Sequence, residues 1–121
     1  MAHVKDRREL GALGEELAAA HLRRDGMRIV ARNWRCRSGE LDIVAARGAT
    51  VVVCEVKTRR SVRCGTPAAA IDADKARRVR ELALLWRNES RRAWRRMRID
   101  AVCVLVGPDG TASIDHRRGV V

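Results

Sequence analysis

Three charged side chains interrupt a stretch of sequence that is otherwise typical of a buried β-hairpin. Two short apolar runs, Leu41–Ala46 and Val51–Val56, flank a Gly-containing turn, which is the pattern of two antiparallel strands. Asp42 lies inside the first run, and Glu55 and Lys57 lie at the end of the second. A carboxylate among apolar neighbours loses hydration unless another group compensates for it. We therefore take these three side chains as the candidate site.

The spacing of these side chains suits phosphodiester chemistry. Residues two apart in a strand share a face. The side chains of Glu40 and Asp42 should therefore point to the same side of the sheet, and so should those of Glu55 and Lys57. Carboxylates that converge in a partly buried site repel each other unless a divalent cation holds them. Oxygen ligands suit Mg²⁺ or Mn²⁺, which would polarise a phosphodiester while Lys57 offsets the developing charge. The alternative is a salt-bridged surface hairpin, in which Lys57 pairs only with Glu55 or Glu40.

The positive charge is concentrated in one part of the chain. The formal net charge is +11, of which residues 58–98 carry +9. Such a segment indicates an anionic partner, most simply nucleic acid, although membrane phosphates would also satisfy it. We expect contacts to nucleic acid from basic residues after the Glu55–Lys57 pair: Arg59, Arg60, Lys75, Arg77, Arg78, Arg91 and Arg92.

The cysteines and the N-terminus bear on location. The four cysteines form no CxxC pair, which argues against a structural zinc site, and we expect reduced thiols and a cytoplasmic protein. The first ten residues lack an apolar signal core, and no apolar run approaches the roughly 20 residues that span a bilayer. A length of 121 residues is most simply one domain.

Two helices should position the site. The first is expected from about Asp6 to Asp25, where helical geometry places Glu15 at the edge of the apolar stripe and Glu16 toward solvent. Gly14 on that stripe predicts close approach to the sheet. The second is expected from Thr66-Pro67, with a restart at Asp72, to about residue 88, and it carries Lys75 in its early part.

Three further strands are expected around the hairpin. Met27–Trp34 precedes it, and Arg98–Val106, the most apolar run, should be central. Residues 107–110 (GPDG) form a strong turn signal, after which Thr111–His116 should return as an edge strand. The predicted order is α-β-β-β-α-β-β.

Short motifs along most of the chain carry a family resemblance. They are Gly11-x-x-Gly14-Glu15, Asn33-x-Arg35, Gly39-Glu40-x-Asp42, Glu55-Val56-Lys57-x-Arg59, Gly65, Lys75 and Arg98-x-Asp100. In combination they resemble the YraN-like family of small bacterial proteins. That family is similar in turn to the restriction-endonuclease-like PD-(D/E)xK nucleases, especially Holliday-junction resolvases.

The resemblance implies a fold and a set of roles. The fold would be an α/β restriction-endonuclease-like core, a mixed β-sheet flanked by two helices. Asp42 and Glu55 would be metal ligands, Glu15 a supporting carboxylate, Lys57 the catalytic lysine and Lys75 a helper on the phosphate side. Mg²⁺ or Mn²⁺ would be the cofactor, and the resolvase likeness also implies a homodimer.

Several other residues have a structural interpretation beside a functional one. Glu40 is either a supporting group of the site or the partner of Arg35 or Arg37. Trp94, set among arginines, is a candidate for stacking on a base, and the alternative is that it covers an edge of the core. Asp100 is expected to pair with Arg98 or a loop rather than to bind metal, and the histidines form no catalytic spacing.

Two functions remain open from the sequence. The first is a magnesium-dependent DNA endonuclease that acts on branched or otherwise structured DNA. The second is a non-catalytic nucleic-acid-binding module that uses the nuclease fold as a basic platform. The intact set of carboxylates favours the enzyme, because a binder gains nothing from negative charge that faces phosphate.

Overall fold

The computed structural model describes residues 6–60 and 72–121. Within them two helices and five strands follow one another in the predicted order. Their bounds are α1 Arg7–Arg24, β1 Arg28–Cys36, β2 Gly39–Arg47, β3 Thr50–Arg59, α2 Ala73–Glu89, β4 Arg96–Val106 and β5 Ala112–Arg117.

The strands form one mixed sheet in the order β1-β2-β3-β4-β5. β3 and β4 are parallel, whereas the other neighbours are antiparallel. The hairpin of β2 and β3 and the edge position of β5 confirm the predictions. The strand expected to be central, β4, is an inner strand beside β3, and β3 itself lies in the middle.

Both helices begin at an aspartate. The Asp6 side chain accepts a hydrogen bond from the Glu9 backbone N–H, and the Asp72 side chain accepts one from the Lys75 backbone N–H, each at 2.8 Å. Such caps satisfy backbone donors that a helix leaves unpaired in its first turn. The expected restart at Asp72 is therefore the start of α2, while the Thr66-Pro67 start lies outside the described residues.

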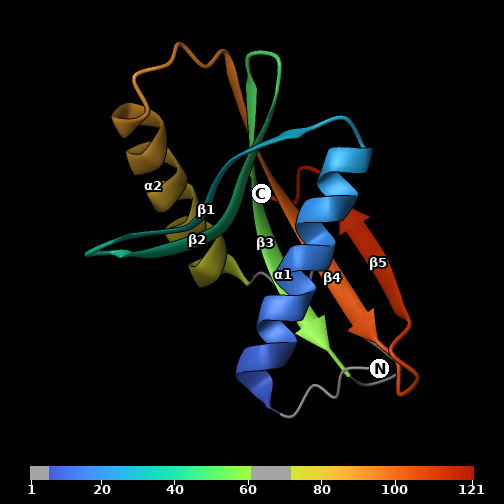
Figure 1. Cartoon of the computed structure of the whole chain (residues 1–121). Helices are drawn as coiled ribbons and strands as arrows, with labels where there is room; N and C mark the ends of the chain where they lie inside the picture. The colour runs from blue at the N-terminus through green and yellow to red at the C-terminus, as the bar shows by residue number, and fades with distance from the viewer. Residues whose placement is uncertain (1–5, 61–71) are drawn as a thin grey trace.

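The two helices cover opposite faces of the sheet (Figure 1). On the α1 face the core is built mainly from small and branched side chains, including Ala18, Leu22 and Val104. On the α2 face Trp86 and Trp94 join the aliphatic side chains. The core therefore consists mainly of closely packed aliphatic side chains, and its tryptophans lie only on the α2 face.

Gly14 marks the closest approach of α1 to the sheet. A Cβ atom at this position would lie 1.8 Å from the Thr58 Oγ1 atom and 2.7 Å from the Thr58 Cβ atom of β3. Any side chain larger than a hydrogen would push the helix away. This confirms the predicted reason for Gly14, and it fixes the height of the next residue, Glu15, above β3.

The ends of four secondary-structure elements lie at one end of the sheet (Figure 1). The C-terminal ends of the parallel strands β3 and β4 lie there, together with the N-terminal ends of α1 and α2. Ligands of α/β sheets commonly bind at the carboxyl ends of parallel strands. Helix N-termini also carry partial positive charge, which favours an anion.

The thiols differ from the expectation in one respect. Cys36 and Cys54 are free, but Cys103 is disulfide-bonded, so the prediction that every thiol is reduced is wrong. Within the described ranges, neither helix is both long and apolar enough to cross a membrane.

Candidate active site

Asp42 lies where the two strands of the hairpin separate. The β2–β3 ladder runs from Arg47 opposite Thr50 to Ile43 opposite Cys54 and ends there. Asp42 is the next residue of β2, and its Oδ2 atom accepts a hydrogen bond of 2.8 Å from the Val56 backbone N–H. The carboxylate thus takes the place of a ladder carbonyl, which explains how an apolar strand accommodates it.

Glu55 lies beside Asp42, and its pKa is well above the ordinary value for a glutamate. Burial, followed by the charge of Asp42 and a hydrogen bond with it, raises the pKa of Glu55 to about 8. The positive charge of Lys75 opposes this rise, and the charge of Glu40 adds to it. Near neutral pH the Asp42–Glu55 pair therefore keeps a proton rather than two negative charges.

Glu15 approaches Asp42 from α1. Its side chain is 15% exposed, against 65% for Glu16, which confirms that Glu16 points toward solvent and Glu15 does not. Burial and then the charge of Asp42 raise the pKa of Glu15. The Arg32 guanidinium lies 3.5 Å from the Glu15 Oε1 atom, but that oxygen has no hydrogen-bond partner among the described residues.

Two lysines lie in this region, and one of them, Lys75, acts directly on a carboxylate. Burial lowers the pKa of Lys57, and the charges of Arg59 and Lys75 lower it further. Lys75, in the first turn of α2, lies close enough to Glu55 to lower the pKa of that carboxyl. The structure therefore brings Asp42, Glu55 and Lys75 together, while Lys57 lies near Lys75 and Arg59 and lines neither of the two hollows beside Asp42.

Asp42 and Val56 line two hollows. The hollow beside α1 has a volume of about 750 Å³ and is also lined by Glu15, Arg59 and Arg60. The hollow beside α2 has a volume of about 330 Å³. It is also lined by Glu40, Glu55, Lys75 and Arg78. Cationic side chains thus border the carboxylates on both sides, which suits a phosphate chain that passes over Asp42.

The remaining predicted residues lie in three different surroundings. Arg77 is exposed and pairs with Asp74 at 3.1 Å. Arg91 and Arg92 follow the far end of α2, a helix of 17 residues, and therefore lie roughly 25 Å along the helix from Lys75. Glu40 pairs with Arg35 at 2.8 Å, so its structural role is met, although it also lines the hollow beside α2.

The side chains around Asp42 give a cation two neighbouring carboxyl groups, those of Asp42 and Glu55. In the part of the chain that the structure describes, no three His, Cys, Asp or Glu side chains are grouped closely enough to form a complete metal site. Asp42 and Glu55 nevertheless interact directly, and within residues 6–60 and 72–121 the buried Glu15 Oε1 atom has no hydrogen-bond partner. Mg²⁺ usually takes one or two carboxylates and keeps several waters, so this donor set suits it.

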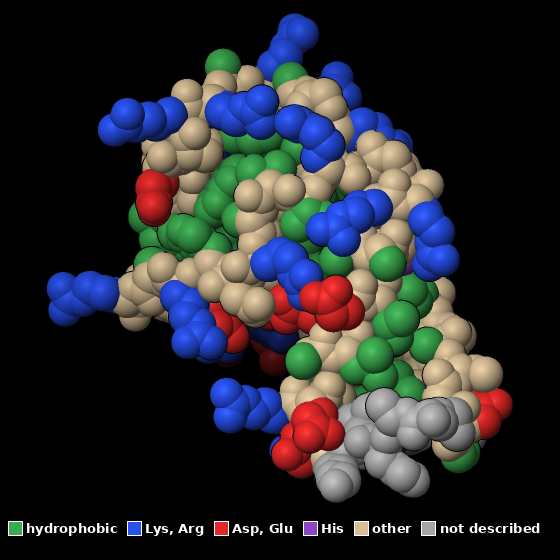
Figure 2. Space-filling view, viewed as in Figure 1, with side chains coloured by type: hydrophobic (Ala, Val, Ile, Leu, Met, Phe, Trp, Pro, Cys, Tyr) green, Lys and Arg blue, Asp and Glu red, His purple; other side chains and the backbone are tan. Residues whose placement is uncertain are grey.

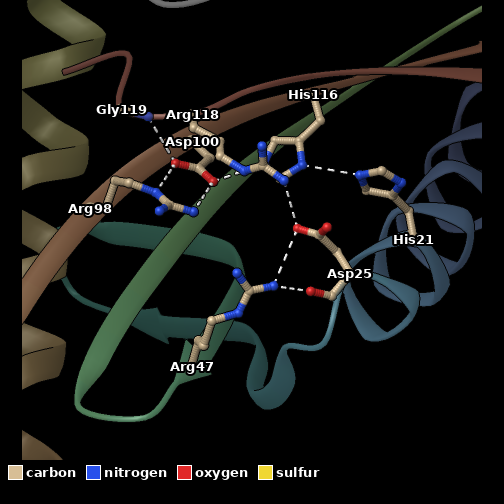
Figure 3. A network of polar contacts seen from close by, with 8 residues as sticks. All are labelled: His21, Asp25, Arg47, Arg98, Asp100, His116, Arg118 and Gly119. Carbon is tan, nitrogen blue, oxygen red and sulfur yellow. Dashed lines mark hydrogen bonds and ion pairs between the residues drawn. The ribbon is translucent and has the colours of Figure 1, made fainter.

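A second polar cluster surrounds Asp100 (Figure 3). This fully buried carboxylate accepts hydrogen bonds from Arg98 at 2.8 and 3.1 Å and from the Gly119 backbone N–H at 2.9 Å. His116 lies 2.7 Å from it and contacts His21 at 3.0 Å. The expected Arg98 pair is confirmed, and Asp100 is fully engaged away from Asp42.

The two histidines and Trp94 show what the sequence interpretation missed. His21 and His116 are 95 positions apart, so only the pairing of β5 with β4 brings them together. Trp94 is 6% exposed, packs on Trp86 with ring centroids 5.9 Å apart, and donates a hydrogen bond to Ser90. The prediction of Trp94 as a base-stacking residue is therefore wrong, because its ring faces the core.

The mixed sheet, its two flanking helices and the acidic site at the opening of the β2–β3 hairpin define a restriction-endonuclease-like α/β domain. The chain belongs to the Uncharacterised protein family UPF0102, whose profile matches residues 14–104. This confirms the YraN-like resemblance.

Relatives named "UPF0102 protein" match over nearly their whole length. The protein from Nocardia farcinica is 52% identical over 120 residues, which cover 99% of this chain and 94% of the relative. The protein from Rhodococcus opacus is 50% identical over 90% of this chain and 92% of its own. The protein from Mycolicibacterium vanbaalenii is 46% identical over 99% of both chains.

Proposed function

We propose that this protein is a metal-dependent DNA endonuclease that hydrolyses phosphodiester bonds in structured or branched DNA. The observation that carries the proposal is the Asp42–Glu55 pair, in which burial, and then the charge of Asp42 and the hydrogen bond with it, raise the pKa of Glu55 to about 8. A purely structural pair would gain more from a neutral or oppositely charged partner. A divalent cation removes the repulsion and makes the arrangement useful.

The residues divide the chemistry among them. Asp42 and Glu55 would hold Mg²⁺ or Mn²⁺, with Glu15 in support from α1. The bound cation would polarise the scissile phosphate and activate a water molecule. Lys57, two residues beyond Glu55 on β3, would offset the negative charge that develops on the phosphate.

Cationic side chains would guide the nucleic acid across the site. Arg59 and Arg60 line the hollow on one side of Asp42, and Lys75 and Arg78 line the hollow on the other. On the face in Figure 2, Lys and Arg side chains stand out around much of the edge, while Asp and Glu side chains lie mostly in the lower half. Long-range attraction would bring the backbone in, and the lining residues would place one phosphate over the carboxylates.

A non-catalytic nucleic-acid-binding module is the second candidate. The basic segment favours it equally, since binding needs only the positive charge. Asp42, Glu55 and Glu15 oppose it, because three carboxylates under a bound phosphate would weaken binding. This candidate predicts salt-sensitive binding that neither metal nor substitution of Asp42 alters much.

Cleavage of a panel of DNA substrates tests the proposal. End-labelled four-way junction, flap, single-stranded and duplex DNA would be incubated with excess protein, in Mg²⁺, in Mn²⁺ and in chelator. We expect metal-dependent cleavage of at least one branched or unpaired substrate, with little cleavage of continuous duplex. Absence of cleavage of every substrate in both metals, by protein that still binds DNA, would instead support the binding module.

A further inference from the structure

The segment between α2 and β4 presents four arginines at the end of the molecule opposite Asp42. Arg91, Arg92, Arg95 and Arg96 are all exposed. Seven other arginines form ion pairs with carboxylates of the described residues, whereas these four form none. Figure 1 shows the connection from α2 to β4 at the top of the molecule. In the same view, Figure 2 shows Lys and Arg side chains along that edge. We call these four residues the arginine platform.

The backbone of the platform is held in place by many contacts. The N–H groups of Arg95 and Arg96 both donate to the Ala49 carbonyl in the β2–β3 turn, at 2.8 and 3.3 Å. Arg87 donates to the Trp94 carbonyl at 2.6 Å, and the Trp94 indole donates to Ser90 at 2.8 Å. The burial of Trp94 therefore anchors the segment and leaves its arginines facing solvent.

These features favour a built binding surface over a solvated linker. A linker that served only solubility would need neither an anchoring tryptophan nor fixed backbone hydrogen bonds. Four arginines within six residues concentrate positive charge in this segment, and no carboxylate of the described residues forms an ion pair with them. Arg92 lies 5.3 Å from the centre of the Trp94 ring, which holds its guanidinium over an aromatic face. The planar guanidinium group binds a phosphate through two parallel hydrogen bonds, so an exposed arginine cluster suits a chain of backbone phosphates.

We propose that the arginine platform is a second contact for nucleic acid, which binds the phosphates of a duplex arm at a distance from the cleavage site. The length of α2, roughly 25 Å, separates the platform from Lys75 and corresponds to about seven base pairs at 3.4 Å each. The inference rests on the proposed function for its substrate class. We infer in addition that a substrate binds tightly only when a duplex arm of about seven base pairs extends beyond the carboxylate site at Asp42.

Equilibrium binding to duplexes of increasing length tests the platform. Metal-free protein in chelator would be titrated against fluorescent duplexes of about 6, 10, 14 and 18 base pairs at several salt concentrations. The test variant is Arg91→Gln with Arg92→Gln, and the charge-matched control is Arg28→Gln with Arg117→Gln, two exposed arginines outside the platform. Thermal unfolding would show that both variants remain folded.

The wild type should bind duplexes of 10 base pairs or more at least tenfold more tightly than the 6-base-pair duplex. The platform variant should not show this rise in affinity with duplex length. Its slope of log affinity against log salt should also be smaller by about two, since each phosphate contact contributes about 0.9. The control should change the slope by less than half a unit. Equal slopes and affinities for the platform variant and the control would overturn the proposal, as would binding to anionic lipid vesicles but not to DNA. Because no step requires cleavage, loss of the platform effect and loss of nuclease activity are separate outcomes.

Discussion

Replacement of Asp42 by Asn should stabilise the fold and abolish cleavage. The amide oxygen of Asn can still accept the Val56 N–H bond, so the opening of the hairpin should be preserved. The lost negative charge should reduce metal binding and lower the rate of DNA cleavage by at least about a thousandfold, as for other groups that act directly on the reacting centre. Affinity for DNA should stay equal or rise, because one charge that repels phosphate is gone.

The stabilisation follows from the pKa of Glu55. That pKa is about 8 in the folded protein against an ordinary value of 4.5, so between these pH values the folded state holds a proton that the unfolded chain has released. The free energy of unfolding of the wild type should therefore fall as pH rises from about 5 to 8. Without the Asp42 charge the pKa of Glu55 is lower, and each unit of that decrease should add about 1.4 kcal/mol at pH 8.

Urea unfolding at pH 5.5 and pH 8 measures the effect, with Glu40→Gln as the matched control. Glu40 also faces Glu55 but is paired with Arg35, so its amide variant should change stability and cleavage much less. If Asp42→Asn destabilised the protein at pH 8 and kept wild-type cleavage, the interpretation of the Asp42–Glu55 pair would be wrong.

Replacement of Gly14 by Ala should destabilise the protein by about 3 kcal/mol or more, the range of severe overpacking in a core. The added Cβ would overlap Thr58, a β-branched side chain with little freedom to move. α1 would then have to shift away from β3 and take Glu15 with it. Circular dichroism during urea unfolding would give the loss of stability directly.

Gly11 provides the matched control on the same helix. A Cβ at Gly11 would meet no atom within 4 Å among the described residues. Gly11→Ala should therefore stabilise the protein by roughly 1 kcal/mol through helix propensity alone. Opposite signs for two identical substitutions three residues apart would show that contact, and not propensity, decides the result at Gly14; equal signs would contradict the packing described above.

Much of the fold follows from local patterns. The hairpin, the Gly14 contact and the greater exposure of Glu16 than of Glu15 follow from the periods of strand and helix, and the structure confirms all three. The start of α2 at Asp72 also follows from a local preference, that of Asp for the N-cap position of a helix. These features depend on residues that are close together in sequence.

The features that were missed depend on long-range placement. The sequence pattern groups Arg91 and Arg92 with Lys75 by charge, but the rigid length of α2 carries them to the other end of the molecule. Trp94 has arginines as sequence neighbours, yet Trp86 and Ser90 draw its ring inward. The contact between His21 and His116 requires that the order of strands in the sheet be known.

Binding of Mn²⁺ to the metal-free protein in the absence of DNA is the most direct test of the central claim that Asp42 and Glu55 form a divalent cation site. A calorimetric or electron paramagnetic resonance titration would compare the wild type with Asp42→Asn and Glu40→Gln. We expect one specific Mn²⁺ per chain in the wild type and in Glu40→Gln, and at least tenfold weaker Mn²⁺ binding in Asp42→Asn. Equal binding by the wild type and Asp42→Asn would contradict it.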